Sequence, residues 1–329
     1  MTASERASAI SLTPAYDIRP LQRLSFRTES TASAMNDHLQ IIIVMFLWAI
    51  CFPLIVLGLS EAPHLTFATL RAALAGVALL IPALWLRRSM PRGWRIWGSL
   101  AVIGFGATTL GFIGMFHAAE FVAPGAATVI ANTQPLMAAV LAHFYLNEHL
   151  DVRGKTGLSL GFVGIILIAT PALTSGTATN YPVGIAYLIL AAVGITFSNV
   201  LIRRMAGTLD PLVAMGWQLV LGSIPLAVIA MATEPVTAIN WSGRFVFSLI
   251  SLSVFGTAIV YWMWCKVLRN VELNRANAFS FLIPIFGVAM GVGFYGERLE
   301  WLAIIGVALT IVGIILVNRS TRTHDETGA

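Results

Sequence analysis

The chain has 329 residues, of which 57% are hydrophobic and 11% are charged, and its mean hydropathy is +0.83. A water-soluble domain of this length needs far more charge to cover its surface, so the composition excludes one. The formal net charge of +5 would suit nucleic-acid binding in a soluble protein. Here the basic residues lie between apolar segments, where they indicate orientation in a lipid bilayer, and no nucleic-acid partner is expected.

The segment before the first apolar run, residues 1–37, is rich in Ser, Thr, Ala and Arg and lacks the apolar core of a signal peptide. Two interpretations stay open for it: a disordered cytoplasmic tail, or a translation start at Met35 that removes nearly all of it. We assign it no function. A second cytoplasmic tail is expected at 319–329.

From residue 39 onward, apolar runs of roughly 20 residues follow one another, each long enough to cross about 30 Å of hydrocarbon as a helix. They show no period-two alternation, which excludes a β-barrel. Ten such segments are expected, at 39–59, 64–86, 96–117, 122–146, 155–172, 182–202, 211–232, 245–265, 274–295 and 299–317. The predicted fold class is an all-α integral membrane protein with ten transmembrane helices.

The ten segments form two related sets, because special residues recur with a constant offset of 149 residues in the best-matched part. The recurring residues are Pro135, Glu148, Gly157 and Gly164, which return as Pro284, Glu297, Gly306 and Gly313. Four positions kept at identical spacing indicate an internal duplication. We predict one repeat at 38–172, an external linker at 173–181 and a second repeat at 182–318.

Basic residues divide the loops into two kinds. One kind holds Arg87, Arg88, Arg92, Arg95, Arg153, Lys155, Arg203, Arg204, Lys266, Arg269 and Arg275, whereas the other holds Arg244 and Arg298. The positive-inside rule therefore places both termini in the cytoplasm of a cell whose inner or plasma membrane the chain crosses many times. Since each repeat has an odd number of spans, five, the two repeats are expected to be inverted, as in several secondary transporters.

Two stretches of the chain are similar to a known family. GAATVIANTQPLMAAVLAHFYLNEHL (Gly125–Leu150) and RANAFSFLIPIFGVAMGVGFYGERL (Arg275–Leu299) each contain small residues, an apolar run with a central proline, and a glutamate after the helix. They resemble the EamA-type repeat of the drug/metabolite transporter superfamily, with Trp48, Phe52 and Arg71 as supporting residues. The resemblance covers about 38–318 and implies a ten-helix carrier, often an exporter of amino acids or related metabolites.

The most informative polar cluster at membrane depth is Asn132, Thr133 and Gln134, near the middle of the expected helix at 122–146. The next residue, Pro135, cannot donate to the carbonyl of Ala131, so the backbone there is locally freed. We predict that the three side chains bind a solute; interhelical hydrogen bonding is the alternative. The mirror segment at 281–284 keeps the proline but is apolar, so a site here is asymmetric.

Three further residues are candidates for substrate binding. Arg71 lies about 10 Å along the second helix, where it could oppose an anionic group, although a role in helix packing is favoured because the other repeat has the uncharged Gln218 at the nearest equivalent place. Trp48 lies deep in the first helix and could stack on a solute. Asn199 lies in the sixth helix and could line the solute path, although packing is again the favoured interpretation.

Other residues receive structural interpretations. Glu148 and Glu297 are expected to anchor or cap helix ends, Trp262 and Trp264 to form part of an interfacial belt, and Gly157-x3-Gly161 and Gly287-x3-Gly291 to pack helices. None of the 15 acidic residues lies in the middle of a predicted span, so proton exchange through a buried carboxylate is not expected, and facilitated diffusion stays open.

The sequence has no Walker, GxSxG or HExxH motif and no Cys/His cluster with metal spacing, so we expect no enzyme activity, metal or cofactor. The predicted function is that of a secondary transporter for a small neutral or zwitterionic, amino-acid-like metabolite. The family resemblance implies that this metabolite is transported out of the cell. A non-transporting scaffold or sensor, an importer and a homodimer are left open.

Overall fold

The computed structural model describes residues 19–118, 121, 130–174, 181–235, 239–295 and 301–319. Residues 1–39 and 40–329 form two separate compact units, and the packing described below is that of the second. Within the described residues every regular element is a helix.

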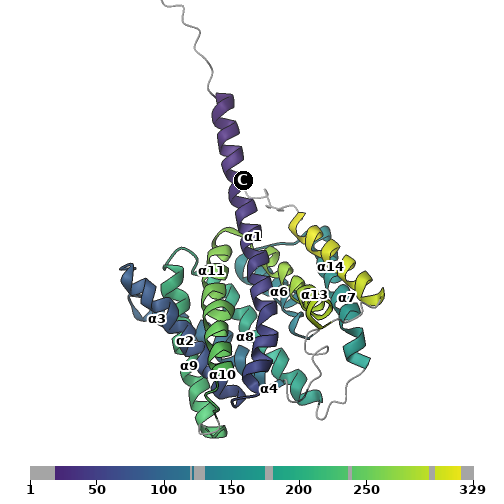
Figure 1. Ribbon diagram of the computed structural model, residues 1–329. Helices are drawn as coiled ribbons and strands as arrows, with labels where there is room; N and C mark the ends of the chain where they lie inside the picture. The colour runs from purple at the N-terminus through teal and green to yellow at the C-terminus, as the bar shows by residue number, and fades with distance from the viewer. Residues whose placement is uncertain are drawn as a thin grey trace, which may run out of the picture. The chain divides into compact units, whose positions relative to one another are not determined.

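The helices of the first repeat follow the predicted order (Figure 1). They are α1 (Arg19–Leu59), α2 (His64–Trp85), α3 (Trp94–Ile103), the π-helix η1 (Gly104–Leu110), α4 (Gly111–Ala118), α6 (Gln134–Leu146) and α7 (Val152–Thr174). The three elements α3, η1 and α4 follow one another without a break and together form the third span. Residues 122–129 of the expected fourth span lie outside the described residues.

The elements of the second repeat also make up its spans in the predicted order. They are α8 (Tyr181–Arg204), α9 (Pro211–Thr233), α10 (Gly243–Ser253), the π-helix η3 (Val254–Ile259), α11 (Val260–Asn270), α12 (Leu273–Ala278), the 3-10 helix η4 (Phe279–Phe281), α13 (Leu282–Tyr295) and α14 (Trp301–Arg319). Over the described residues, nine segments are long and apolar enough to cross a membrane, and Gln134–Leu146 is a shorter apolar helix. These helices confirm the predicted all-α membrane fold.

The helix α1 begins at Arg19, so residues 19–37 are helical and differ from the disordered tail that we expected there. The reason lies in the composition: Pro20 stands at the first turn, where proline is tolerated, and no Gly or Pro follows it before Asp37. Residues 1–18 and 320–329, the remaining parts of the expected tails, lie outside the described residues.

Equivalent helices of the two repeats pack against each other in an antiparallel pair, α7 with α14 (Figure 1). A Cβ atom added to Gly157 would lie 2.7 Å from the carbonyl oxygen of Gly313, and one added to Gly306 would lie 2.6 Å from that of Gly164. Gly157 corresponds to Gly306 and Gly164 to Gly313, so the two contacts are copies of one another. Contacts that exchange equivalent residues across an antiparallel pair are those expected of inverted repeats.

The two predicted small-residue motifs behave differently. In the first, Gly157 lies against α14 and Gly161 lies against the ring of Phe281, which would be 2.5 Å from an added Cβ. In the second, an added Cβ at Gly287 would meet no atom within 4 Å in the part of the chain that the structure describes. The packing interpretation is therefore confirmed for the first motif and wrong for Gly287, because spacing along a helix does not say which face another helix covers.

Two irregularities recur at equivalent places in the two repeats. The third helix of each contains a π segment, η1 packing against α9 and η3 packing against α2. The fourth helix of each is interrupted just before the duplicated proline: residues 132–133 form a turn ahead of α6, and η4 precedes α13. Because proline cannot donate the helical hydrogen bond, Pro135 and Pro284 account for both interruptions.

Candidate solute site

Arg71 of α2 is buried, with 5% of its surface exposed, and its guanidinium is held by the second repeat. Its Nε donates to the hydroxyl of Thr257 at 2.8 Å, and its Nη2 donates to the carbonyl oxygen of Gly256 at 3.2 Å; both partners belong to η3. The Cys51 sulfur lies 3.7 Å from Nη2, and the guanidinium carbon lies 5.2 Å from the centroid of the Phe112 ring. These partners are all neutral, so they hold the positive charge in place without cancelling it.

The second repeat makes the corresponding contact with the first repeat. Gln218 of α9 accepts a hydrogen bond at 3.0 Å from Thr108 of η1, and Thr108 and Thr257 are 149 residues apart, the offset of the duplication. The side-chain nitrogen of Gln218 is buried, and no described residue forms a hydrogen bond with it. In each repeat, therefore, a long polar side chain on the second helix binds the π segment of the other repeat, and only one of the two is charged.

Aromatic side chains of α1 and α11 lie against one another. The ring of Trp48 lies 5.6 Å from that of Trp264 and 6.4 Å from that of Tyr261, measured between centroids. The indole nitrogen of Trp264 donates at 2.9 Å to the amide oxygen of Asn199 on α8. Trp264 thus connects two of the predicted site residues, Trp48 and Asn199. Trp48 and Tyr261 are both half-buried.

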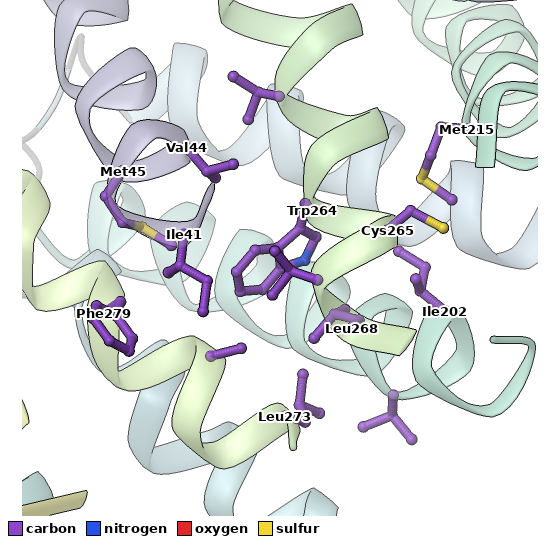
Figure 2. Close-up of a cluster of buried hydrophobic side chains, with 14 of the residues drawn as sticks. Ile41, Val44, Met45, Ile202, Met215, Trp264, Cys265, Leu268, Leu273 and Phe279 are labelled. Carbon is purple, nitrogen blue, oxygen red and sulfur yellow. The ribbon is translucent and has the colours of Figure 1, made fainter. Parts of the chain in front are cut away.

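Assigning Trp264 to an interfacial belt was wrong. Its side chain is 2% exposed and lies between Val44 of α1 and Cys265 in the hydrophobic cluster of Figure 2. The sequence interpretation ended this helix near residue 265, whereas α11 continues to Asn270 and carries Trp264 more than a turn deeper. Trp262 fits a helix end better, since the ammonium of Lys266 lies 4.7 Å from its ring centroid.

The cluster at Asn132, Thr133 and Gln134 lies at the interruption of the fourth helix. Asn132 is 7% exposed, Thr133 is the residue before α6, and Gln134 is the first residue of α6. The hydroxyl of Thr133 donates at 2.7 Å to the carbonyl oxygen of Ile130, so it stabilises the turn itself. Thr133 therefore has a structural role in this turn, and solute binding by Asn132, Thr133 and Gln134 stays a prediction.

Glu148 caps a helix of the opposite repeat. Its carboxylate accepts hydrogen bonds from the backbone N–H groups of Leu273 and Asn274, at 3.0 and 3.1 Å, at the start of α12. Arg203 lies 3.6 Å away. Burial raises the pKa of the Glu148 carboxyl, and the two N–H donors and the guanidinium act in the opposite direction. The predicted capping role of Glu148 is confirmed, while Glu297 lies outside the described residues.

A similar cap was missed at the start of α2. Glu234 accepts from the N–H groups of Leu65 and Thr66 at 2.8 and 2.7 Å, and His64 lies 3.3 Å from it. The second nitrogen of His64 lies 2.8 Å from His117 of α4. Nothing in the local sequence around Glu234 marks this contact, because its partners are about 170 residues away.

The comparison with known families agrees with the architecture. The model of the EamA-like transporter family matches residues 37–170 and again residues 182–319. The chain belongs to the EamA-like transporter family.

Among other members, an uncharacterized transporter of Synechocystis is 30% identical over 88% of this chain and 92% of its own length. A chloroplastic WAT1-related protein of Arabidopsis thaliana is also 30% identical, but the match covers 76% of this chain and 62% of that longer protein. A protein of Escherichia coli named a probable amino-acid metabolite efflux pump is 24% identical over 85% of this chain and 94% of its own. One solved crystal structure has the same fold, with a TM-score of 0.74, 18% identity, and coverage of 86% of this chain and 96% of its own.

In this EamA-like transporter, Arg71, Trp48 and Asn199 all contact one span of the second repeat, and the sequence analysis did not predict this. The connecting residues are Thr257, Gly256, Tyr261 and Trp264, all on the continuous span η3–α11. The offset that places Thr257 opposite Thr108 was available in the sequence. This offset could have identified Thr108 and Thr257 as equivalent residues before the structure was known.

Proposed function

We propose that this EamA-like transporter exports a small neutral or zwitterionic metabolite, resembling an amino acid, across the cytoplasmic membrane. Both termini lie in the cytoplasm, and the repeats at 38–172 and 182–318 are joined by an external linker at 173–181. The residues that line the solute path are Asn132, Thr133, Gln134, Trp48, Asn199 and Arg71.

The interruption of both fourth helices carries the proposal. Discontinuous helices near the middle of a bilayer expose backbone groups and helix ends that can bind a solute. The α6 helix begins at such an interruption, and its N-terminus carries a partial positive charge that favours a carboxylate. Asn132 and Gln134 flank this end with amides that can donate and accept hydrogen bonds.

The charges of the lining select the class of solute. Arg71 adds one positive charge that its neutral partners leave uncompensated, which opposes a wholly cationic solute. A phosphorylated sugar normally requires several Lys or Arg side chains, and this lining offers one. A zwitterion with a carboxylate near α6 or Arg71, and an apolar part against Trp48, matches the set best. The name of the relative from Escherichia coli supports the same class and an outward direction.

Counterflow in sealed vesicles tests the proposal. The full chain is reconstituted into liposomes loaded with a mixture of unlabelled amino acids, and the entry of each labelled amino acid is followed. We expect counterflow of at least one neutral amino acid and none of tetraphenylphosphonium or glucose 6-phosphate. Counterflow of the cation or the sugar phosphate, with no amino acid moving, would contradict the proposal.

A further inference from the structure

Three polar residues follow one another at intervals of three along the first half of the interrupted helix in the second repeat. They are Asn274 and Asn277 of α12 and Ser280 of η4. Asn274 is 3% exposed and Asn277 is 4% exposed. The Oδ1 of Asn274, the Nδ2 of Asn277 and the Oγ of Ser280 are all buried and have no hydrogen-bond partner among the described residues. We call these three residues the α12 row.

Unpaired atoms of this kind are costly. A buried polar group without a partner costs about 1–3 kcal/mol, and the hydrocarbon of a lipid bilayer cannot supply one. One orphaned atom can be a local accident of packing, but three in a row on one helix call for a ligand. Residues three apart on a helix are about 4.5 Å apart along its axis, so the row extends over roughly 9 Å.

The two ends of the row lie at places already connected with the solute site. Asn274 is at the start of α12, where Glu148 accepts from its backbone N–H. Ser280 is in η4, directly before the segment with Pro284. The helix α12 also packs against α6, which begins at Gln134. The row therefore leads from the end of α12 capped by Glu148 to the interruption of its helix, alongside the half-helix that carries the proposed site.

We propose that the α12 row is the contribution of the second repeat to solute binding, and that it forms the path from the cytoplasmic end of the bundle to the interrupted helices. This inference rests on the proposed function and names the part of the zwitterion that each residue meets. The amide oxygen of Asn274 accepts from an ammonium group, and Asn277 and Ser280 donate to a carboxylate. The spacing of about 4.5 Å between neighbours suits the two charged ends of an α-amino acid.

The row also explains how the two repeats share one site although their sequences differ. The positions equivalent to Asn274 and Asn277 in the first repeat are Gly125 and Thr128, so the amides are not duplicated. The first repeat instead has its amides at Asn132 and Gln134, at and after its own interruption. The first repeat thus supplies amides at and after the interruption of its fourth helix, and the second repeat supplies amides before its own interruption.

Cysteine accessibility tests the row without knowledge of the transported solute. In the full chain carrying Cys51→Ala and Cys265→Ala, single cysteines replace Asn274, Asn277 or Ser280. Inside-out membrane vesicles are treated with a charged methanethiosulfonate that does not cross lipid. Ala276→Cys and Ala278→Cys are the matched controls, since both alanines are on α12 and 0% exposed.

We expect the three row positions to react at least about tenfold faster than both controls, since a solute path admits water and the packed alanine positions do not. A mixture of neutral L-amino acids should slow the reaction at Asn277→Cys and Ser280→Cys, while sorbitol should not. Ser280→Cys is nearly isosteric, so it reports on the row even where a variant at an asparagine folds poorly. Equal reaction at row and control positions overturns the proposal.

The two proposals can fail separately. Protection by amino acids at the row supports both. If amino acids move in liposomes but do not protect the row, the proposed function stands and the α12 row is not its path. If neither flux nor protection is found, both proposals are wrong.

Discussion

The contact between α7 and α14 gives the sharpest quantitative prediction, because glycine backbone meets glycine backbone there. A Cβ atom at Gly313 would lie 2.5 Å from the oxygen and 2.9 Å from the Cα of the facing residues Gly157 and Gly161, respectively. Non-bonded heavy atoms normally approach to about 3.5 Å. Backbone cannot rotate away as a side chain can, so Gly313→Ala must push the two helices apart by roughly 1 Å.

The expected cost follows from two opposing terms. Overpacking of a close-packed interior typically costs about 1–3 kcal/mol, and alanine regains up to about 1 kcal/mol of helix propensity over glycine. Because the added Cβ at Gly313 meets only backbone atoms, the overpacking cost should lie in the upper part of this range, at about 2–3 kcal/mol. The net loss of stability for Gly313→Ala is therefore about 1–2 kcal/mol. At Gly287 an added Cβ meets nothing within 4 Å, so Gly287→Ala should be neutral or stabilising by up to about 1 kcal/mol.

Thermal stability in detergent measures the difference. Wild type, Gly313→Ala and Gly287→Ala are heated, and the folded fraction that remains is followed by fluorescence-detected size exclusion. We expect the midpoint of Gly313→Ala to fall by roughly 1.5–3 °C for a chain of this length, with that of Gly287→Ala unchanged or higher. If Gly313→Ala is as stable as wild type, or if both variants lose stability equally, the close packing of α7 on α14 is refuted.

Three further predictions concern topology, coupling and the solute. Reporters fused after Lys155 and after Thr177 should lie in the cytoplasm and outside, respectively, and finding both on the same side would exclude five spans per repeat. Glu148→Gln keeps one acceptor for the start of α12, so flux should persist to within a few-fold; complete loss at normal expression would indicate proton coupling instead. Gln134→Leu should weaken apparent affinity for the transported amino acid by about tenfold or more, since an unpaired solute group costs roughly 1–3 kcal/mol. The mirror substitution Ile283→Leu is the control, and an equal effect of both in concentration-dependent counterflow would assign Gln134 to packing.

The sequence alone determined the membrane fold, because the bilayer imposes a local rule on every span. A helix must be apolar over about 20 residues to cross it, and this property can be read without knowing what the helix touches. The duplication was equally visible, since Gly157 and Gly306 kept their spacing from the two prolines. The interruption at residues 132–133 was also foreseeable, because Pro135 lacks the backbone donor that a continuous helix requires.

Only the tertiary structure decided which faces of these helices meet. In a bilayer a helix is apolar on its lipid side and on its protein side, so sequence pattern does not separate the two. Trp264 was therefore assigned to the wrong environment, and Gly287 to a contact that does not exist. The hydrogen bond from Arg71 to Thr257 joins residues 186 positions apart, and that pairing depends on how the two repeats dock.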